Sequence, residues 1–216
     1  ISRSLDGGVS WEKFNAGLPD NYPGSSYAMD LVIPQIVVLS NGNVYALVSG
    51  VRPELSEAEY IALAVPSSEL LLEQSDQTTQ YYSWINAAFT GIYLLDVVNG
   101  ATSWQLLRGN IDLTSHGNWD PLHLPWKRPM SFAIDPNNSN ILWLTDIEPK
   151  TFQSRASGVW KSVDNGQNWQ FVHQHTVALD INVDPNNSNN VIVAGPKSWG
   201  NGGIYVSNDG GSSWTL

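Results

Sequence analysis

The feature that most constrains this chain is an eight-residue pattern, S-x-D-x-G-x-x-W, that occurs three times along it. The close copies begin at Ser4, Ser162 and Ser207, and a looser copy without the serine ends at Trp104. Repetition at this scale indicates a chain built from similar small units, each of which must stack on its neighbours to bury an apolar face.

A six-residue pattern, D-P-N-N-S-N, precedes two of these copies and marks a second turn in each unit. It begins at Asp135 and again at Asp184, 49 residues later, whereas the tryptophans that follow, Trp169 and Trp214, are 45 residues apart. Short alternating apolar runs flank every copy, which is typical of strands joined by tight turns. Each unit is therefore predicted to contain four antiparallel strands, A to D, with the six-residue turn between A and B and the eight-residue turn between C and D.

Four-stranded units at this period predict an all-β fold made of β-propeller blades. Within one propeller domain spanning 1–216, we expect a C–D hairpin over 1–16 and a blade over 29–108 with an insertion over 50–90. Two further blades are expected over 129–172 and 177–216. Because closed propellers have about four to eight blades, three blades plus one hairpin indicate a partial propeller. The remainder of the propeller, in the same precursor or in another chain, is then an expected partner.

Composition excludes several classes of function. The formal net charge of −10 argues against nucleic-acid binding, because a protein that binds a polyanion must supply cations. No apolar run approaches the roughly 18 residues that a membrane span needs. The absence of cysteine removes disulfides and thiolate metal sites. His173 and His175 have no third ligand at a suggestive spacing, so neither a metal nor a cofactor is predicted.

The eight-residue pattern resembles the Asp-box, or BNR repeat, of sialidases, xyloglucan-cleaving glycosidases and sortilin-type receptors. The three close copies and the looser one cover nearly the whole chain. The resemblance implies an Asp-box propeller that is extracellular or lies at the cell surface. It also implies a structural role for the pattern, because Asp accepts turn amide hydrogens, Gly takes a positive φ and Trp folds back over the hairpin. The residues that match the motif are Ser4, Asp6, Gly8, Trp11, Ser162, Asp164, Gly166, Trp169, Ser207, Asp209, Gly211 and Trp214.

The resemblance leaves two functions open. One is a carbohydrate-active or carbohydrate-binding propeller, for which glycoside hydrolysis is the expected reaction if the chain is catalytic. The alternative is a non-catalytic surface or assembly protein that uses the propeller face to bind protein. An open cleft with paired carboxylates and aromatic platforms would favour a glycan, and a broader, flatter face would favour a protein. Sialidase activity is not expected, because Val32 occupies the position at which sialidases have an arginine before Ile-Pro.

The blade interpretation places the long, irregular segments on one face. The A–B and C–D turns share the opposite face, so binding is expected at the B–C and D–A loops. Loop aromatics can stack on sugar rings, and the modest charge of these loops suits a neutral polysaccharide. Glycoside hydrolysis also needs two carboxylates. The expected substrate-binding residues are Trp119, His123, Trp126 and Trp199, and the catalytic candidates are Asp120 and Asp146.

Overall fold

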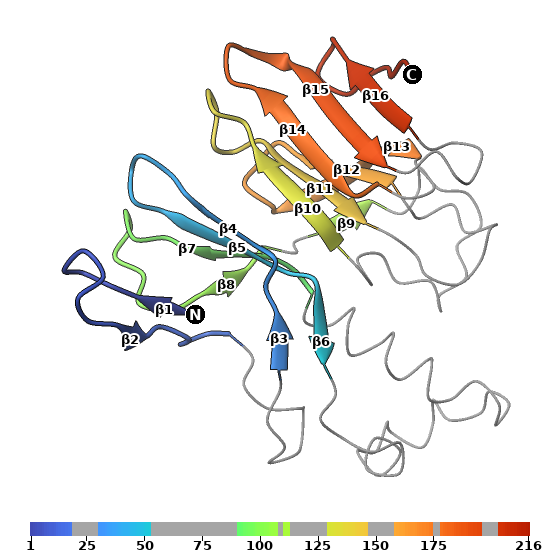
Figure 1. The fold of residues 1–216 in the computed structure, drawn as a ribbon. Helices are drawn as coiled ribbons and strands as arrows, with labels where there is room; N and C mark the ends of the chain where they lie inside the picture. The colour runs from blue at the N-terminus through green and yellow to red at the C-terminus, as the bar shows by residue number, and fades with distance from the viewer. Residues whose placement is uncertain are drawn as a thin grey trace, which may run out of the picture.

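The computed structural model describes residues 1–18, 30–52, 90–107, 110–112, 129–146, 158–174, 178–195 and 203–216, and every regular element in them is a strand. The strands form a hairpin and three larger sheets that follow one another through the molecule, with the termini at opposite ends (Figure 1). Among these residues, no helix has the length and apolarity that crossing a membrane requires. The expectation of an all-β fold is confirmed.

The N-terminal hairpin pairs β1 (Ser2–Arg3) with β2 (Glu12–Lys13). It is followed by sheet I, whose neighbouring strands are all antiparallel. In order across the sheet, the strands are β4 (Gln35–Val38), β5 (Val44–Val48), β7 (Gly91–Leu95) and β8 (Gln105–Leu106). Nearly every residue of β5 and β7 is buried and apolar, so sheet I is covered on both faces.

A short antiparallel ribbon extends from sheet I. In it, β6 (Gly50–Arg52) pairs with β3 (Asp30–Val32). Pro34 lies in the break between β3 and β4. Proline has no backbone N–H to donate, and none is needed at this position because it is outside both ladders. The ribbon therefore includes the first residues of the insertion that the sequence predicts over 50–90.

Sheet II contains four antiparallel strands in sequence order, as predicted. They are β10 (Pro129–Ile134), β11 (Leu142–Asp146), β12 (Gly158–Ser162) and β13 (Asn168–Gln174). A fifth strand, β9 (Asn110–Asp112), pairs with β13 in a parallel direction. The sequence patterns predict neither a strand at 110–112 nor its parallel pairing. The added strand satisfies the backbone groups that the edge of β13 would otherwise expose.

Sheet III repeats the pattern with β14 (Asp180–Asp184), β15 (Asn187–Gly195) and β16 (Gly203–Ser207), all antiparallel. Its fourth position is held by Thr215 alone, which exchanges two backbone hydrogen bonds with Val206 at 2.8 and 2.9 Å. The sheets therefore have the A-to-D order that the sequence predicts, and in sheet III the D position is the shortest.

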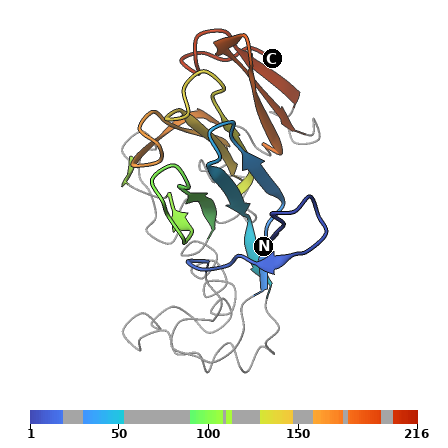
Figure 2. The ribbon, with the colours of Figure 1, turned by 90° about the vertical axis from the view of Figure 1, so that its left-hand side faces the viewer.

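The core lies between consecutive sheets. One apolar cluster joins the hairpin to sheet I around Trp104, a second joins sheets I and II around Trp160 and Trp169, and a third joins sheets II and III around Trp143. Trp143 and Trp160 are 1% and 0% exposed, so these strand tryptophans pack inside. A second view shows the same succession from the hairpin to sheet III (Figure 2).

Candidate functional site

The eight-residue turns are closed by their own side chains. In sheet II, Ser162 Oγ donates to Asp164 Oδ1 at 2.8 Å and accepts from the Gly166 amide at 2.8 Å. The Asp164 carboxylate accepts from the Asn168 amide at 2.8 Å and from the Asn168 side chain at 2.6 Å. Trp169 Nε1 donates back to Gly166 O at 3.1 Å. These bonds fix the turn without any contribution from a ligand.

The other two close copies make the same contacts. The corresponding residues are Ser4, Asp6, Gly8, Ser10 and Trp11 in the hairpin, and Ser207, Asp209, Gly211, Ser213 and Trp214 in sheet III. Two consecutive residues of each turn take a positive φ, as at Asn165 (56°) and Gly166 (80°). Asn and Gly adopt this conformation at the lowest cost, which accounts for their presence at these positions.

Hydrogen bonds hold the pKa of the turn carboxyls below the usual range. The Ser213 hydroxyl and amide lower the pKa of Asp209 to about 2. Ser10 likewise holds the pKa of Asp6 well below its usual value. At Asp164, burial raises the pKa, but the hydrogen bonds from Asn168 and its neighbours together outweigh it. A carboxylate that stays ionised and already accepts several hydrogen bonds is unsuited to general acid catalysis at neutral pH.

The tryptophan of each turn faces the sheet that precedes it. Trp169 Nε1 donates a second hydrogen bond to Leu107 O of sheet I at 3.2 Å, and the ring is 1% exposed. Trp214 stacks on His173 of sheet II, with ring centroids 4.9 Å apart. Trp11 has no preceding sheet among the described residues and is 66% exposed. Burial of this tryptophan therefore depends on the neighbouring sheet and not on the turn itself.

The looser copy in sheet I keeps the contact with the preceding unit but not the serine contacts. The Asp96 carboxylate accepts from the Asn99 amide at 3.2 Å and from the Asn99 side chain at 2.6 Å. Trp104 Nε1 donates to Phe14 O of the hairpin at 2.9 Å. The tryptophan thus joins consecutive units even where the turn is longer.

The six-residue and eight-residue turns lie at one edge of the sheets, here named the turn edge. Within sheet II, the Asn165 amide donates to Asn140 O at 2.8 Å, and within sheet III the Gly210 amide donates to Asn189 O at 3.0 Å. Each bond joins the A–B turn of a sheet to its C–D turn. Figure 1 shows the β4–β5, β10–β11 and β14–β15 turns on the same side of the molecule.

The strand ends that flank the long connections lie at the opposite edge, here named the loop edge. Asp146 ends β11 at this edge, opposite Pro129 and Gly158, and it is 2% exposed. The other predicted site residues lie outside the described residues: Trp119, Asp120, His123, Trp126 and Trp199. Of the candidates, Asp146 alone belongs to the described part of the chain.

A row of polar side chains crosses all three sheets at the loop edge. Ser131 Oγ donates to Asp180 Oδ1 at 2.9 Å and also lies 3.4 Å from Gln35 Oε1. Gln35 holds the backbone of Phe132, accepting from its amide at 3.0 Å and donating to its carbonyl at 2.9 Å. The three side chains come from β4, β10 and β14, the first strands of their sheets. Ser131 is buried, whereas Asp180 is exposed, and the Asp180 carboxylate also accepts from the Ile181 amide at 2.9 Å and from Asn182 Nδ2 at 3.3 Å.

Sequence reasoning missed this row. Ser131 and Asp180 are 49 residues apart, which is the spacing of the two six-residue patterns, so aligning the repeats places them at equivalent positions. No chemical motif marks them, because the row forms only where neighbouring sheets meet.

The described residues contain no group of three His, Cys, Asp or Glu side chains that is placed to hold a metal ion. His173 packs between Tyr205 and Trp214, with ring centroids 4.7 and 4.9 Å away. His175, the other histidine of the pair, lies outside the described residues. The surroundings of His173 are thus those of a packing residue.

Comparison with known proteins supports the fold. No family model matches the chain, and no curated protein matches it. The crystal structure of an ancestral GH74 enzyme is similar at 18% identity, over 94% of this chain and 18% of that chain, with a TM-score of 0.44. The crystal structure of the GH74 xyloglucanase from Xanthomonas campestris is similar at 13% identity, over 94% of this chain and 23% of that chain, with a TM-score of 0.52.

At this identity the likeness to the Xanthomonas enzyme bears on the fold alone. Together with the order of strands in sheets I to III, it identifies the sheets as β-propeller blades, as the sequence predicts. The chain spans about a fifth of the length of the solved structures that it matches.

Proposed function

We propose that this chain is part of an Asp-box propeller, extracellular or at the cell surface, whose loop edge binds a neutral polysaccharide. The observation that carries the proposal is the division of the molecule into two edges. At the turn edge, the carboxylates of the eight-residue turns are occupied by their own hydrogen bonds, as at Asp164 and Asp209. The strand ends at the loop edge, such as Asp146 and Gly195, lead into the long segments that contain the aromatic candidates in the sequence.

The hydrogen-bond set of the turns supports the assignment to the Asp-box type. The Ser, Asp, Gly and Trp positions of the motif each have a defined part in closing the turn. The structural role proposed for these residues therefore has a physical basis in all three close copies.

The chemistry of the loop segments favours a glycan over a charged ligand. Trp119 and Trp126 flank Asp120 and His123 in one short stretch, and Trp199 belongs to a further loop. Aromatic rings stack on sugar rings, and carboxylates accept hydrogen bonds from sugar hydroxyls. The Xanthomonas enzyme of similar fold is a xyloglucanase, which makes xyloglucan the first ligand to test.

Binding of a xyloglucan oligosaccharide tests the proposal by calorimetry on the complete protein. Replacing Trp119 and Trp126 by alanine is expected to weaken binding by about tenfold or more, since each aromatic contact contributes about 0.5–1.5 kcal/mol. Trp11→Ala is the control, because it removes an indole that lies at the turn edge. Unchanged affinity in the double variant would contradict the proposal.

Catalysis is tested separately. Asp120 and Asp146 are the proposed carboxylates, and conversion of either to asparagine is expected to lower glycoside hydrolysis by about 10²-fold or more while binding persists. Equal turnover in both variants and the parent protein would remove them from the mechanism and leave a binding function.

A further inference from the structure

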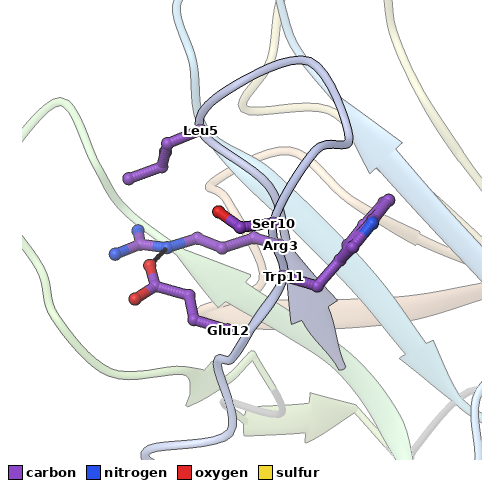
Figure 3. A pocket seen from close by; sticks show the side chains of 5 residues that line it. All are labelled: Arg3, Leu5, Ser10, Trp11 and Glu12. Carbon is purple, nitrogen blue, oxygen red and sulfur yellow. Dashed lines mark hydrogen bonds and ion pairs between the residues drawn. The ribbon is translucent and has the colours of Figure 1, made fainter.

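Each motif turn fixes its aspartate with a side-chain donor on the second carboxylate oxygen, Oδ2. In the hairpin, Ser10 Oγ donates to Asp6 Oδ2 at 2.6 Å, and Figure 3 shows Ser10 next to Trp11 in this turn. In sheet III, Ser213 Oγ donates to Asp209 Oδ2 at 2.6 Å. In sheet II and in the looser turn of sheet I, the donor is an asparagine. Those two turns therefore depend on a side chain that can lose its amide group.

The two asparagines make the same contact but have different neighbours in the chain. Asn168 in sheet II and Asn99 in sheet I each donate from Nδ2 to the turn aspartate at 2.6 Å. Asn168 is followed by Trp169, which is 1% exposed, whereas Asn99 is followed by Gly100. An asparagine side chain reacts with the amide nitrogen of the next residue, and glycine hinders this approach least because it has no side chain. Asn99 is thus the turn donor whose neighbour permits the reaction.

The reaction at Asn99 consumes water and needs no other reagent. The Gly100 nitrogen gives its proton to solvent and bonds to Asn99 Cγ, while the bond from Cγ to Nδ2 breaks and Nδ2 leaves as ammonia. The cyclic imide then adds water at either of its carbonyls and opens to aspartate or isoaspartate. The net change replaces the amide by a carboxylate and releases ammonium, which is one reason that asparagine is thermolabile in proteins.

The looser turn is accessible to this reaction. Asn99 and Gly100 are both exposed, and a Cβ added at Gly100 would meet nothing within 4 Å. The Gly100 amide donates to Val97 O at 3.0 Å, within the same turn. Because both partners belong to one exposed turn, local opening of this turn is enough to release the nitrogen.

The pair Asn165–Gly166 shows how packing protects the same dipeptide. The Gly166 amide donates to Ser162 Oγ at 2.8 Å, and a Cβ added at Gly166 would lie 2.7 Å from Leu107 Cβ of sheet I. Asn165 Oδ1 accepts from Tyr45 Oη, also of sheet I, at 3.3 Å. Attack on Asn165 therefore requires sheets I and II to separate.

Loss of the amide has a structural effect at Asn99, because the new group cannot donate. It would bring two carboxylates together at the present 2.6 Å contact with Asp96, where like charges repel. The Asn99 side chain is also the main reason that the pKa of Asp96 lies below its usual value. Asn41 precedes a glycine too, but its Oδ1 accepts from the Asn43 amide at 3.0 Å, and a carboxylate oxygen would accept equally well.

We propose that Asn99 is a site of spontaneous deamidation in the folded protein, and that its conversion loosens the turn of sheet I that ends at Trp104. Trp104 Nε1 donates to Phe14 O at 2.9 Å, so the effect reaches the junction between this sheet and the hairpin. The modification thus converts a local chemical event into a weaker contact between two units.

Peptide mass spectrometry on the complete native protein, incubated at mildly alkaline pH, tests the site. Conversion at Asn99 is expected to be at least about tenfold faster than at Asn165 or Asn168, since those two react only after packed segments open. Digestion in heavy-oxygen water marks any conversion that occurs after unfolding. In urea, Asn99 and Asn165 should convert at similar rates, because both precede glycine. Equal native rates at Asn99 and Asn165, or an unconverted Asn99, would overturn the proposal.

The structural effect is measured with the substitution that imitates the product. Asn99→Asp is expected to lower the urea midpoint of unfolding, whereas the matched control Asn41→Asp should leave the midpoint unchanged. Gly100→Ala should slow conversion at Asn99, because the added carbon hinders attack. Equal midpoints for Asn99→Asp and the parent protein would overturn the proposed loosening of the turn.

Discussion

Substitution of Gly166 by alanine tests the packing of one sheet on the next. Gly166 takes φ 80° in the eight-residue turn of sheet II. A Cβ at this position would lie 2.7 Å from Leu107 Cβ and 3.3 Å from Leu107 O, both in sheet I. The first distance is shorter than van der Waals contact allows, and both atoms are held by the backbone. Either Leu107 or the whole junction between sheets I and II must move.

The expected cost has two parts. A left-handed conformation costs a non-glycine residue about 1–2 kcal/mol, and an extra methyl in a packed core costs about 1–3 kcal/mol. Gly166→Ala is thus expected to lower the free energy of unfolding by about 2–5 kcal/mol. Gly100→Ala is the matched control, because Gly100 takes φ 75° in a turn but has nothing within 4 Å of the added carbon. It is expected to lose only the conformational part, about 1–2 kcal/mol.

Equilibrium urea denaturation measures both variants against the parent protein at an unchanged denaturant slope. The difference between the two losses reports the clash at the junction alone, because the backbone term is common to both. Equal losses in Gly166→Ala and Gly100→Ala would refute the described packing of sheet II on Leu107.

Three further predictions follow from the contacts between sheets and within turns. Trp169→Phe removes the donor to Leu107 O and Gly166 O and is expected to cost about 1–3 kcal/mol by urea denaturation, so a loss below about 0.5 kcal/mol would contradict the two buried hydrogen bonds. The hydrogen bonds that lower the pKa of Asp209 from 3.8 to about 2 stabilise the fold above pH 3.8, and this contribution disappears as the pH falls to about 2. Melting temperatures of Asp209→Asn should accordingly fall less steeply than those of the parent protein over that window, and parallel curves would count against the turn bonds. Lys161→Met keeps the side-chain length but removes the 2.6 Å bond from Nζ to Gly210 O between sheets II and III, for an expected loss of about 1 kcal/mol. An unchanged free energy of unfolding would show that this bond is not formed.

The repeats made much of the fold predictable, because local chemistry determines the turns. The residues needed to close each eight-residue turn are all within it, as from Ser162 to Trp169. The order of strands in sheets I to III follows from those turns and from the alternating apolar runs between them. The positions of Trp143 and Trp160 inside the sheets follow from the same alternation.

The parts that sequence did not predict depend on distant partners. β9 joins the edge of β13 through backbone hydrogen bonds, which leave no pattern in the side chains of Asn110–Asp112. The contrast between Trp11 and Trp169 has the same origin, since identical turns differ in whether a preceding sheet covers the indole. The polar row of the loop edge likewise requires three strands that lie far apart in the chain. Local sequence patterns therefore identify the individual sheets but not the contacts between neighbouring sheets.

The most direct test of the two-edge account follows the indole N–H resonances of the ten tryptophans during titration with a neutral xyloglucan oligosaccharide. The account predicts that the signals of Trp119, Trp126 and Trp199 shift with the ligand. Trp169 and Trp214 should keep their positions, because their N–H groups remain bonded within the turn edge. Shifts confined to Trp169 and Trp214, with the three loop signals unmoved, would contradict the assignment of binding to the loop edge.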